Sequence, residues 1–409
     1  MIESDVIIVG GGAAGFFSAI NIAENNPALK ITILERGSEV LTKVRISGGG
    51  RCNVTHAEFI PNQLSSNYPR GEKELLGPFH TFMTGDTMEW FEKKGIPLKI
   101  EEDGRIFPES NSSQTIINCF IKEAERLHIE VLKQHPVKWI KKEKNNWLIS
   151  TDKKSFTSKK VIIASGSNPK IWNLLNNLGH SIVPPVPSLF TFNINDSRIK
   201  ELPGISTMAA VSVLLKDGTT KLKSEGPLLI THWGLSGPAI LKLSAWGAVD
   251  LFDMNYQFRI KVNWLKPETK ESVFERLKEL KLKYVKKSLH KNPQLELPKR
   301  LWQNLLLASN IHENQKWAET NHHQLLELAS QLTQTIFHVQ GKSTFKEEFV
   351  TAGGIDLKEI NFKRYESKIH KGLFFAGEVL NIDAITGGFN FQNAWTGGFI
   401  AAKAITTND

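Results

Sequence analysis

The strongest constraint on the fold is a glycine-rich turn near the start of the chain, within residues 5–36, DVIIVGGGAAGFFSAINIAENNPALKITILER. Four apolar residues, Val6 to Val9, lead into the turn, and small and apolar residues then recur at helical spacing through Ile22. A second apolar run, Ile31 to Leu34, follows. This order predicts a strand, a tight turn, a helix and a second strand, and therefore a βαβ start to an α/β domain.

The chemistry of this unit points to a dinucleotide. Gly10 makes the turn because glycine readily takes a positive φ, Gly12 leaves room for a diphosphate, and Gly15 lets helix and strand pack closely. The amino end of the helix presents N–H groups and positive partial charge to that diphosphate. At the end of the second strand, a carboxylate can accept both hydroxyls of an adenosine ribose. The residues expected to bind the cofactor here are Gly10, Gly12, Ala13, Ala14, Gly15 and Glu35.

The C-terminal stretch indicates which dinucleotide is bound. In residues 372–405, GLFFAGEVLNIDAITGGFNFQNAWTGGFIAAKAI, an apolar strand delivers Gly377 and Glu378 to its carboxyl end, where an acid can bond a ribityl chain. A second glycine turn, with Gly388, Phe389 and Asn390, precedes a helix whose amino end would face a negative charge. Reduced flavin carries such a charge and nicotinamide does not, so the segment favours FAD.

Length and composition limit the class of protein. A chain of 409 residues with 40% hydrophobic content should form at least two compact units. No stretch approaches twenty uninterrupted apolar residues, and the first residues enter a strand without a signal-like series, so we expect a cytoplasmic protein with no membrane span. The two cysteines, Cys52 and Cys119, give neither a disulfide framework nor a metal site, and Cys119 is expected in the core.

The basic character of the chain is concentrated in one segment. The formal net charge is +9, and residues 261–300 hold twelve Lys or Arg and five Glu. Within it, Val273, Leu277, Leu280 and Tyr284 share one helical face, so an amphipathic, solvated helix is the simpler interpretation. Docking of nucleic acid through 261–300 stays open as the alternative.

Composition along the chain predicts a discontinuous domain. The proline cluster 184–187 marks a border, residues 188–265 alternate like strands, 267–335 read as helices, and strand and glycine patterns return beyond Gly341. We therefore expect a cofactor-binding domain from 1–187 and 341–409, an inserted β-barrel from 188–266 and 335–340, and a helical subdomain over 267–334. Within the first domain we also expect one strand over 156–164, ending in Ala164-Ser165-Gly166, which should contact the cofactor, and a helix opened by a capping box at 86–89.

Six motifs together resemble a known family over essentially the whole chain. They are VGGGAAG at 9–15, ISGGGRCNVT at 46–55, FPESNSSQ at 107–114, LLITHWGLSGPAIL at 228–241, VTAGGI at 350–355 and FAGEVLNIDAITGGFNFQNAW at 375–395. The sequence is similar to the bacterial aminoacetone-oxidase-like or BaiN-like (YhiN-like) NAD(P)/FAD-dependent oxidoreductases. Two departures stand out: Ser165 where relatives often have Thr, and Ala384-Ile385 before the final Thr-Gly-Gly, where the turn geometry is less certain.

The resemblance implies one non-covalent FAD in a glutathione-reductase-like domain with an inserted barrel and helical bundle. It also implies FAD contacts from the residues Ala14, Glu35, Arg36, Ser47, Gly48, Gly49, Gly50, Arg51, Cys52, Asn53, Val137, Gly377, Glu378 and Asn390. Arg51 is a candidate to stabilise phosphate or reduced-flavin charge, with an ordinary salt bridge as its alternative. Cys52 is expected to pack beside the flavin rather than to act in a disulfide relay. His232 is a candidate proton donor, and its alternative is a structural role.

Only one complete dinucleotide fingerprint occurs in the sequence. Any NAD(P)H must therefore bind transiently, or another reductant must replace it. The first hypothesis is a flavin-dependent oxidoreductase of a small organic or steroid-like substrate, for example a C=C reductase using NAD(P)H. The alternatives are an RNA-associated flavoprotein and a non-catalytic flavin-binding protein. Oligomeric state has no signal in the sequence.

Overall fold

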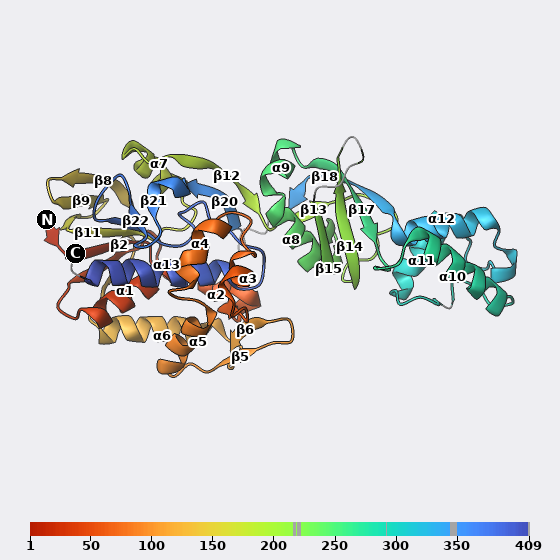
Figure 1. Ribbon diagram of the computed structural model, residues 1–409, viewed down its shortest axis with the longest axis horizontal. Coiled ribbons are helices and arrows are strands. Elements are labelled where there is room, and N and C mark those ends of the chain that lie inside the picture. Colours follow the sequence, from red (N-terminus) through yellow and green to blue (C-terminus); the bar gives the residue numbers. More distant parts are fainter. Residues whose placement is uncertain (216–217, 219–221, 292, 344–349, 408–409) are drawn as a thin grey trace. The chain divides into compact units, whose positions relative to one another are not determined.

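The computed structural model describes residues 1–215, 218, 222–291, 293–343 and 350–407, which divide into two compact units. The first unit comprises residues 1–186 and 346–409, and the second comprises 187–345 (Figure 1). Each unit has its own hydrophobic core, one built around Val6–Val9 and the other around the strands and helices of the insert. The chain thus leaves the first unit once and returns to it near the C-terminus.

The first unit is organised on a seven-stranded sheet in which five consecutive strands, reaching one edge of the sheet, run parallel. Its order is β21 (Ile360–Asn361), β22 (Glu366–Ser367), β23 (Leu373–Phe375), β11 (Lys160–Ile163), β2 (Val6–Val9), β3 (Ile31–Leu34) and β7 (Glu130–Leu132). Every residue of β2, β3 and β23 is buried, as expected of parallel strands covered on both faces. The α/β fold with a Rossmann-type domain predicted from the sequence is confirmed.

Three smaller sheets complete the strands of this unit. A four-stranded sheet has the order β1 (Ile2–Glu3), β10 (Ser155–Ser158), β9 (Asn146–Thr151) and β8 (Val137–Glu143). A three-stranded sheet has the order β4 (Thr55–His56), β6 (Arg105–Pro108) and β5 (Leu98–Ile100), and β12 (Ile182–Ser188) pairs with β20 (Val350–Ile355). The single strand expected over 156–164 is therefore wrong, because β10 and β11 belong to different sheets.

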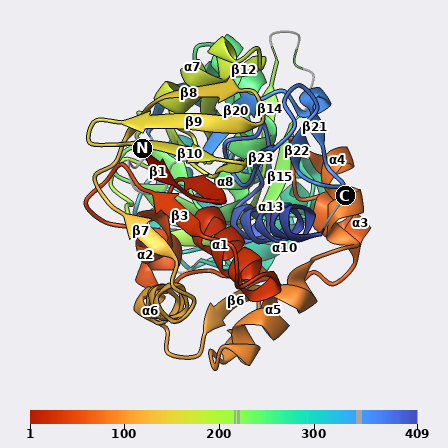
Figure 2. The ribbon, with the colours of Figure 1, turned by 90° about the vertical axis from the view of Figure 1, so that its left-hand side faces the viewer.

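Two long helices from opposite ends of the sequence pack against each other beside the parallel sheet. They are α1 (Ala13–Asn25) and α13 (Phe389–Thr406), which lie side by side in Figures 1 and 2. Both contain many small residues, which allow close approach of the helices. The remaining helices are α2 (Thr42–Gly50), α3 (Pro61–Ser65), α4 (Glu72–Phe79), α5 (Thr84–Lys93), α6 (Ser113–Arg126), α7 (Pro169–Asn177) and the 3₁₀ turn η2 (Leu357–Glu359).

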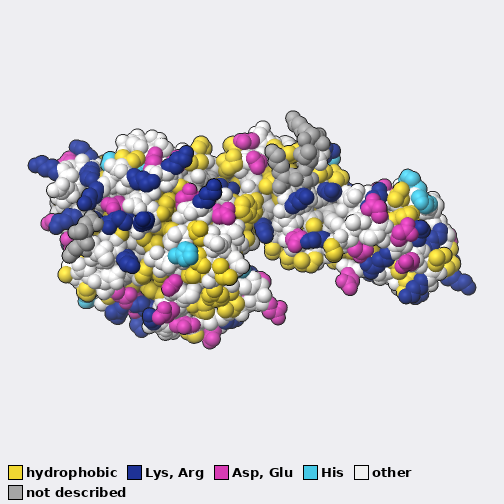
Figure 3. All heavy atoms as spheres, in the orientation of Figure 1, with side chains coloured by type: hydrophobic (Ala, Val, Ile, Leu, Met, Phe, Trp, Pro, Cys, Tyr) yellow, Lys and Arg dark blue, Asp and Glu magenta, His cyan; other side chains and the backbone are white. Residues whose placement is uncertain are grey.

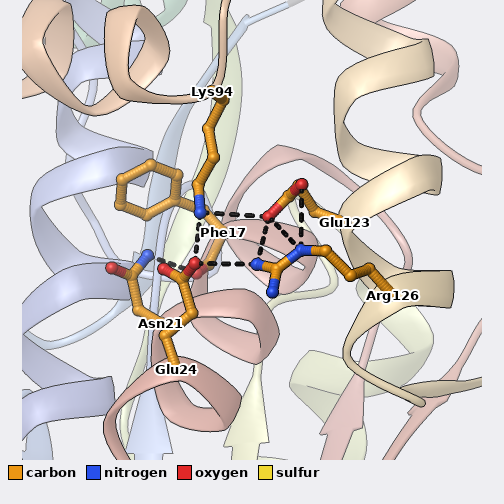
Figure 4. Close-up of polar contacts among 6 residues, drawn as sticks. All are labelled: Phe17, Asn21, Glu24, Lys94, Glu123 and Arg126. Carbon is orange, nitrogen blue, oxygen red and sulfur yellow. Dashed lines mark hydrogen bonds and ion pairs between the residues drawn. The ribbon is translucent and has the colours of Figure 1, made fainter.

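A charge network joins α1, α6 and the residue that ends α5. Lys94 lies between Glu24 and Glu123, with its Nζ 3.0 Å from a Glu123 oxygen, and Arg126 contacts both carboxylates at 3.1 and 2.6 Å (Figure 4). Asn21 faces the same region, but its amide donates to the carbonyl oxygen of Phe17 at 2.7 Å. The Lys94 and Glu123 side chains are each only 12% exposed, so this network fixes the helices that carry it.

The second unit is an antiparallel barrel with attached helices. Its strands have the order β18 (Thr335–Gln340), β17 (Gln257–Asn263), β14 (Ser206–Leu214), β15 (Lys223–Thr231), β16 (Gly234–Ser236), β13 (Thr191–Asn193) and β19 (Lys342–Ser343). The sheet closes at Gly341, between β18 and β19, where φ is +131° and the carbonyl oxygen accepts the Asn193 N–H at 3.0 Å. The helices are α8 (Pro238–Trp246), α9 (Ala248–Asp253), α10 (Lys270–Lys283), α11 (Lys299–Ala308), η1 (Trp317–Glu319) and α12 (His322–Thr333).

In the basic segment, α10 has the amphipathic form predicted for it. Val273 and Leu277 are fully buried in the core of the second unit, and Leu280 and Tyr284 are partly buried against it. The lysines stand on the other faces, and several of them have contacts of their own. Lys281 donates to the carbonyl oxygen of Thr320, and the ammonium of Lys287 lies 4.7 Å from the centre of the Tyr284 ring.

Candidate functional site

Four strands of the parallel sheet end at the same edge and place the predicted glycines and acids side by side. Val9 pairs in register with Leu34 on one side and with Ile163 on the other, and Ile163 pairs with Phe375. The residues that follow these strand ends are Gly10, Glu35, Ala164, Ser165, Gly166, Gly377 and Glu378. Segments far apart in sequence thus meet along the carboxyl edge, which is where α/β sheets bind ligands.

The first glycine turn is closely packed on one side and open on the other. Gly10 has φ +119°, and a Cβ there would lie 2.4 Å from the carbonyl oxygen of Ala164. A Cβ on Gly15 would lie 2.0 Å from the carbonyl oxygen of Gly10, so the helix and the strand touch through the backbone. A Cβ on Gly12 would meet no atom within 4 Å, and no side chain caps α1 there. An open space at an uncapped helix start is suited to a diphosphate.

Backbone N–H groups hold the Glu35 carboxylate at the end of β3. Its two oxygens accept hydrogen bonds from Gly11 at 2.8 Å and Gly37 at 2.7 Å. The N–H of His135 donates to the Glu35 carbonyl oxygen at 2.8 Å, and two residues later Val137 begins β8 as a buried residue. Arg36 is exposed between these segments. The structure thus brings Glu35, Arg36 and Val137 to one side of the edge.

The glycines at 48–50 form a backbone loop with free space beside it. Gly48, Gly49 and Gly50 have φ values of +58°, +68° and +85°. A Cβ on Gly48 would lie 2.9 Å from the Phe107 ring, whereas Cβ atoms on Gly49 and Gly50 would meet nothing within 4 Å. The α2 helix loses its helical geometry at Ser47, where ψ is 147°. Turns of this kind can direct consecutive N–H groups to an anion.

Both reactive side chains at the end of this loop, Arg51 and Cys52, already contact other protein groups. The guanidinium of Arg51 stacks on Phe107 at 3.9 Å and bonds a Glu101 carboxylate oxygen at 2.6 Å, so its charge is paired. Cys52 is fully buried, and burial raises the pKa of its thiol to about 12 despite a hydrogen bond with Ser47. A thiol that stays protonated is a poor redox partner, which agrees with a packing role for Cys52.

The helix α13 begins without a side-chain cap, and an unpaired oxygen of Asn53 lies close to its N-cap residue. Gly388, the N-cap of α13, has φ +97°, and a Cβ there would lie 2.6 Å from the Thr55 carbonyl group and 2.9 Å from Oδ1 of Asn53. This Oδ1 is buried and has no hydrogen-bond partner within the described part of the chain. The Phe389 ring stacks on His56 with centres 4.5 Å apart. The side chain of Asn390 pins the turn instead, because it bonds the N–H and carbonyl of Ala384 at 3.0 and 3.3 Å.

Sequence reasoning missed the long-range contacts that hold this edge. Lys43 on α2 forms an ion pair with Glu378, and Arg70 forms one with the fully buried Asp383. The Gln392 side chain accepts hydrogen bonds from the hydroxyls of Thr55 at 2.6 Å and Thr87 at 3.0 Å. The two residues of each of these contacts lie more than 300 positions apart in the chain, so no local sequence pattern predicts the contacts.

His232 belongs to the second unit. It lies on the exposed turn between β15 and β16, beside Trp233, and it lines a hollow of that unit. The proposed role of His232 as a proton donor therefore stays a prediction, as do the individual cofactor contacts.

The residues at the carboxyl edge fit FAD. The space at Gly12 matches a diphosphate, and the Glu35 carboxylate stands where an adenosine ribose would follow it. The unpaired Asn53 Oδ1 and the uncapped start of α13 leave polar groups for a flavin ring. Both helix starts favour negative charge. The fold and this site define the class of the protein: an FAD-dependent oxidoreductase with a Rossmann-type domain.

Comparison with known proteins gives the family. The chain belongs to the family described as HI0933-like protein Rossmann domain, whose model matches residues 4–404. It is 27% identical to a 3-dehydro-bile acid delta(4,6)-reductase of Clostridium scindens, over 97% of this chain and 98% of that protein. It is 26% identical to a ribosomal RNA dihydrouridine synthase of Escherichia coli, over 98% of both chains. The family resemblance inferred from the motifs is confirmed.

Solved structures agree on the fold. A 3-ketosteroid-Δ4-(5α)-dehydrogenase from Rhodococcus jostii RHA1 superposes with a TM-score of 0.52 at 12% identity, over 100% of this chain and 97% of that one. Among the described residues, no helix has both the length and the apolar character needed to cross a membrane.

Proposed function

We propose that this protein reduces a C=C bond conjugated to a carbonyl group in a small organic or steroid-like molecule, with NAD(P)H as a transient electron donor. The observation that carries the proposal is the carboxyl edge of the parallel sheet, which brings together two uncapped helix starts and the acid that follows β3, with open space at Gly12. Two relatives support the reaction type, because a delta(4,6)-reductase and a dihydrouridine synthase both saturate a C=C bond.

Bound FAD supplies the hydride chemistry. The chain itself supplies position and charge. The N–H groups at the start of α1 would hold the diphosphate, and Glu35 would hold the ribose. The positive end of α13 favours negative charge on the ring placed before it. The Lys43–Glu378 ion pair joins α2 to the segment that follows β23, beside this ring site.

A single dinucleotide fingerprint implies that NAD(P)H has no resident site of its own. The donor and the substrate would then use the same face of the flavin in turn, so steady turnover should follow a ping-pong pattern. A ping-pong pattern would distinguish one site that donor and substrate share from two separate sites.

Anaerobic stopped-flow spectroscopy of the purified holoprotein tests the proposal. We expect NADH or NADPH to bleach the yellow flavin band, and a 4-ene-3-oxo steroid to restore it with loss of its own enone absorbance. The matching saturated 3-oxo steroid is the control and should leave the reduced flavin unchanged. Failure of every donor to bleach the band, or equal reoxidation by both steroids, would contradict the proposal.

A second candidate function has its own observation. The relatives include ribosomal RNA dihydrouridine synthases, and the 261–300 segment carries a strong excess of basic residues. Figure 3 shows, however, that Asp and Glu side chains are interspersed with Lys and Arg on the helical part of the second unit. If this segment docks RNA, its affinity should fall steeply with salt and should vanish when Lys281, Lys283, Lys286 and Lys287 are changed to Glu. No RNA retention by the unaltered protein at low salt rejects this candidate.

A further inference from the structure

The second unit contains a polar hollow that the cofactor site does not use. It has a volume of about 300 Å³ and lies where three turns of the barrel meet. The lining residues are Asn193, Ile194, Asn195, Ile199, Lys200, Thr231, His232, Trp233, Gly234 and Gln340. All of them belong to the second unit, so the hollow is complete within one compact body.

The backbone holds the walls of this hollow in place. Gly234 has φ +144°, and a Cβ there would lie 2.2 Å from the carbonyl oxygen of Phe192, so only glycine fits this turn. The carbonyl oxygen of Trp233 accepts the Ile194 N–H at 2.9 Å, and the Asn193 side chain accepts the Ser343 hydroxyl at 2.8 Å. The lining side chains therefore project from a rigid barrel rim.

The hollow offers hydrogen-bond donors and one positive charge without a counter-charge. Within the described part of the chain, the side chains of Asn195, Lys200 and Gln340 have no hydrogen bond or ion pair, and none of the lining residues is acidic. Two acids adjoin lining residues in the sequence: Asp196 pairs with Arg198 at 2.7 Å, and Glu201, which follows Lys200, is exposed. The side chains of Asn195, Lys200 and Gln340 are all exposed. Ammonium and amide groups that line one hollow without an acid among them are suited to an oxyanion.

The aromatic wall adds a second requirement. Trp233 is 59% exposed although it is a large apolar side chain, and its backbone is fixed by the barrel. An exposed indole beside free donors provides a surface for a planar or ring-shaped group. A volume of about 300 Å³ is at the lower limit for ligand pockets, so it accommodates a head group rather than a whole large substrate.

We propose that this hollow binds an oxyanion, carboxylate or phosphate, that is attached to a ring, with Lys200 and the amide side chains on the oxyanion and Trp233 against the ring. The ligand class is therefore a ring compound that carries negative charge. Carboxylated steroids and nucleotides share this chemistry.

Binding to the holoprotein, followed by quenching of tryptophan fluorescence, tests the site without turnover. Two anionic probes, cholate and uridine 5′-monophosphate, are compared with their neutral partners, the corresponding bile alcohol and uridine. We expect at least one anionic probe to bind, with its neutral partner weaker by about tenfold or more. Preference for cholate identifies a steroid carboxylate as the source of the anion, and preference for the nucleotide identifies a phosphate.

Variants of the lining residues test whether the anionic probe binds in the hollow. Lys200→Met should weaken the anionic probe about tenfold and leave the neutral probe unchanged, and Trp233→Leu should weaken both. Lys223→Met is the control, because Lys223 is exposed at the opposite end of the β15 strand that leads to Thr231. Flavin absorbance and the melting temperature verify that each variant is folded.

The outcomes separate this proposal from the proposed function. Equal binding of anionic and neutral probes, no binding of either anion, or no effect of Lys200→Met overturns the oxyanion site. If the enone steroid is reduced but neither anion binds, the reaction stands and the site falls. If the anion binds through Lys200 but no donor bleaches the flavin, the site stands and the reductase proposal falls.

Discussion

At the scale of single residues, Gly12 is the position where a substitution should affect cofactor binding without disturbing the fold. A side chain there would meet no protein atom within 4 Å, and its φ of −96° is accessible to any residue. Gly10 and Gly15 lack this freedom, because a Cβ on either would collide with backbone. Of these three motif glycines, only Gly12 faces open space.

This difference gives a prediction for Gly12→Asp. An aspartate is a good N-cap, so the apoprotein should be as stable as the parent or more stable by a few tenths of a kcal/mol. Its carboxylate would face the diphosphate, and we expect FAD affinity to fall roughly 100-fold or more. Flavin content after purification and FAD titration measure this. Gly77→Asp, at an exposed helix glycine with equally open space, is the control and should retain FAD. Full FAD retention by Gly12→Asp would contradict the placement of the diphosphate.

Residues close in sequence were the ones that could be predicted. The Val6–Val9 strand, the glycine turn, the helix and the Ile31–Leu34 strand follow one another directly, so periodicity and φ requirements locate them. The ion pairs Lys43–Glu378 and Arg70–Asp383 could not be predicted, since either partner alone is an ordinary charged residue. Fully buried Asp383 is the clearest case, because its burial depends on an arginine 313 residues away.

At the scale of elements, the wrong predictions have local causes. The predicted strand 156–164 splits at Lys159, because Ser158 bonds the carbonyl oxygens of Asp5 and Lys160 while the chain passes from one sheet to another. The chain also passes from one sheet to the other between β1 and β2, because β1 pairs with β10 and β2 pairs with β11. The helix predicted to open at Asp86 begins at Thr84, with Asp86 accepting the Met83 N–H at 2.8 Å. Asp86 therefore lies in the first turn of the helix and is not its N-cap residue.

The network around Lys94 predicts an asymmetric response of two adjacent lysines. Burial alone would lower the Lys94 pKa, but hydrogen bonds to Glu24 and Glu123 outweigh it and raise that pKa. Lys94→Met would leave the Glu24 and Glu123 carboxylates with Arg126 as their shared cation, and should cost about 1–3 kcal/mol in the free energy of unfolding. Lys93→Met removes only a pair whose side chains are 69% and 61% exposed, and should cost less than about 0.5 kcal/mol. Urea unfolding of both variants measures this, and equal costs would show that the network adds no stability.

A buried histidine joins the segment after α7 to the strand β22. His180 Nδ1 is 2.8 Å from a Glu359 oxygen, and its Nε2 is 3.0 Å from the Ser367 hydroxyl. The spacing resembles that of a hydrolytic triad. However, Ser367 is only 6% exposed, and its oxygen also accepts the N–H groups of Ile369 and His370. The arrangement is therefore structural, and it requires a neutral imidazole.

This requirement sets a pH dependence. Burial lowers the pKa of His180 below its usual value, although Glu359 opposes the shift. A histidine with a lowered pKa in the folded state contributes stability above the unfolded pKa of about 6.5, and this is lost as the pH falls through the folded value. We expect the melting temperature to fall between pH 7.5 and 5.5, and less steeply in His180→Asn. The exposed His323→Asn variant is the control and should follow the parent protein. Parallel curves for all three would exclude this role.

At the scale of the whole molecule, two separate hydrophobic cores predict two unfolding transitions. The cofactor cradle draws all its residues from the first unit, so FAD should stabilise that unit alone. Differential scanning calorimetry of the apoprotein with increasing FAD should move one transition upward and leave the other in place. Lys94→Met should lower the same transition that FAD raises. A single transition that shifts as a whole would show that the units unfold together.

The segments β23 and α13 follow the insert in the chain, and this order has a consequence during synthesis. Synthesis runs from the N-terminus, so a nascent chain that has just passed the insert still lacks the strand and the helix that complete the cradle. The insert, whose core needs neither, can fold earlier. The flavin can therefore be held only once both segments have been made, and a chain cut short before residue 373 should accumulate without pigment in the cell.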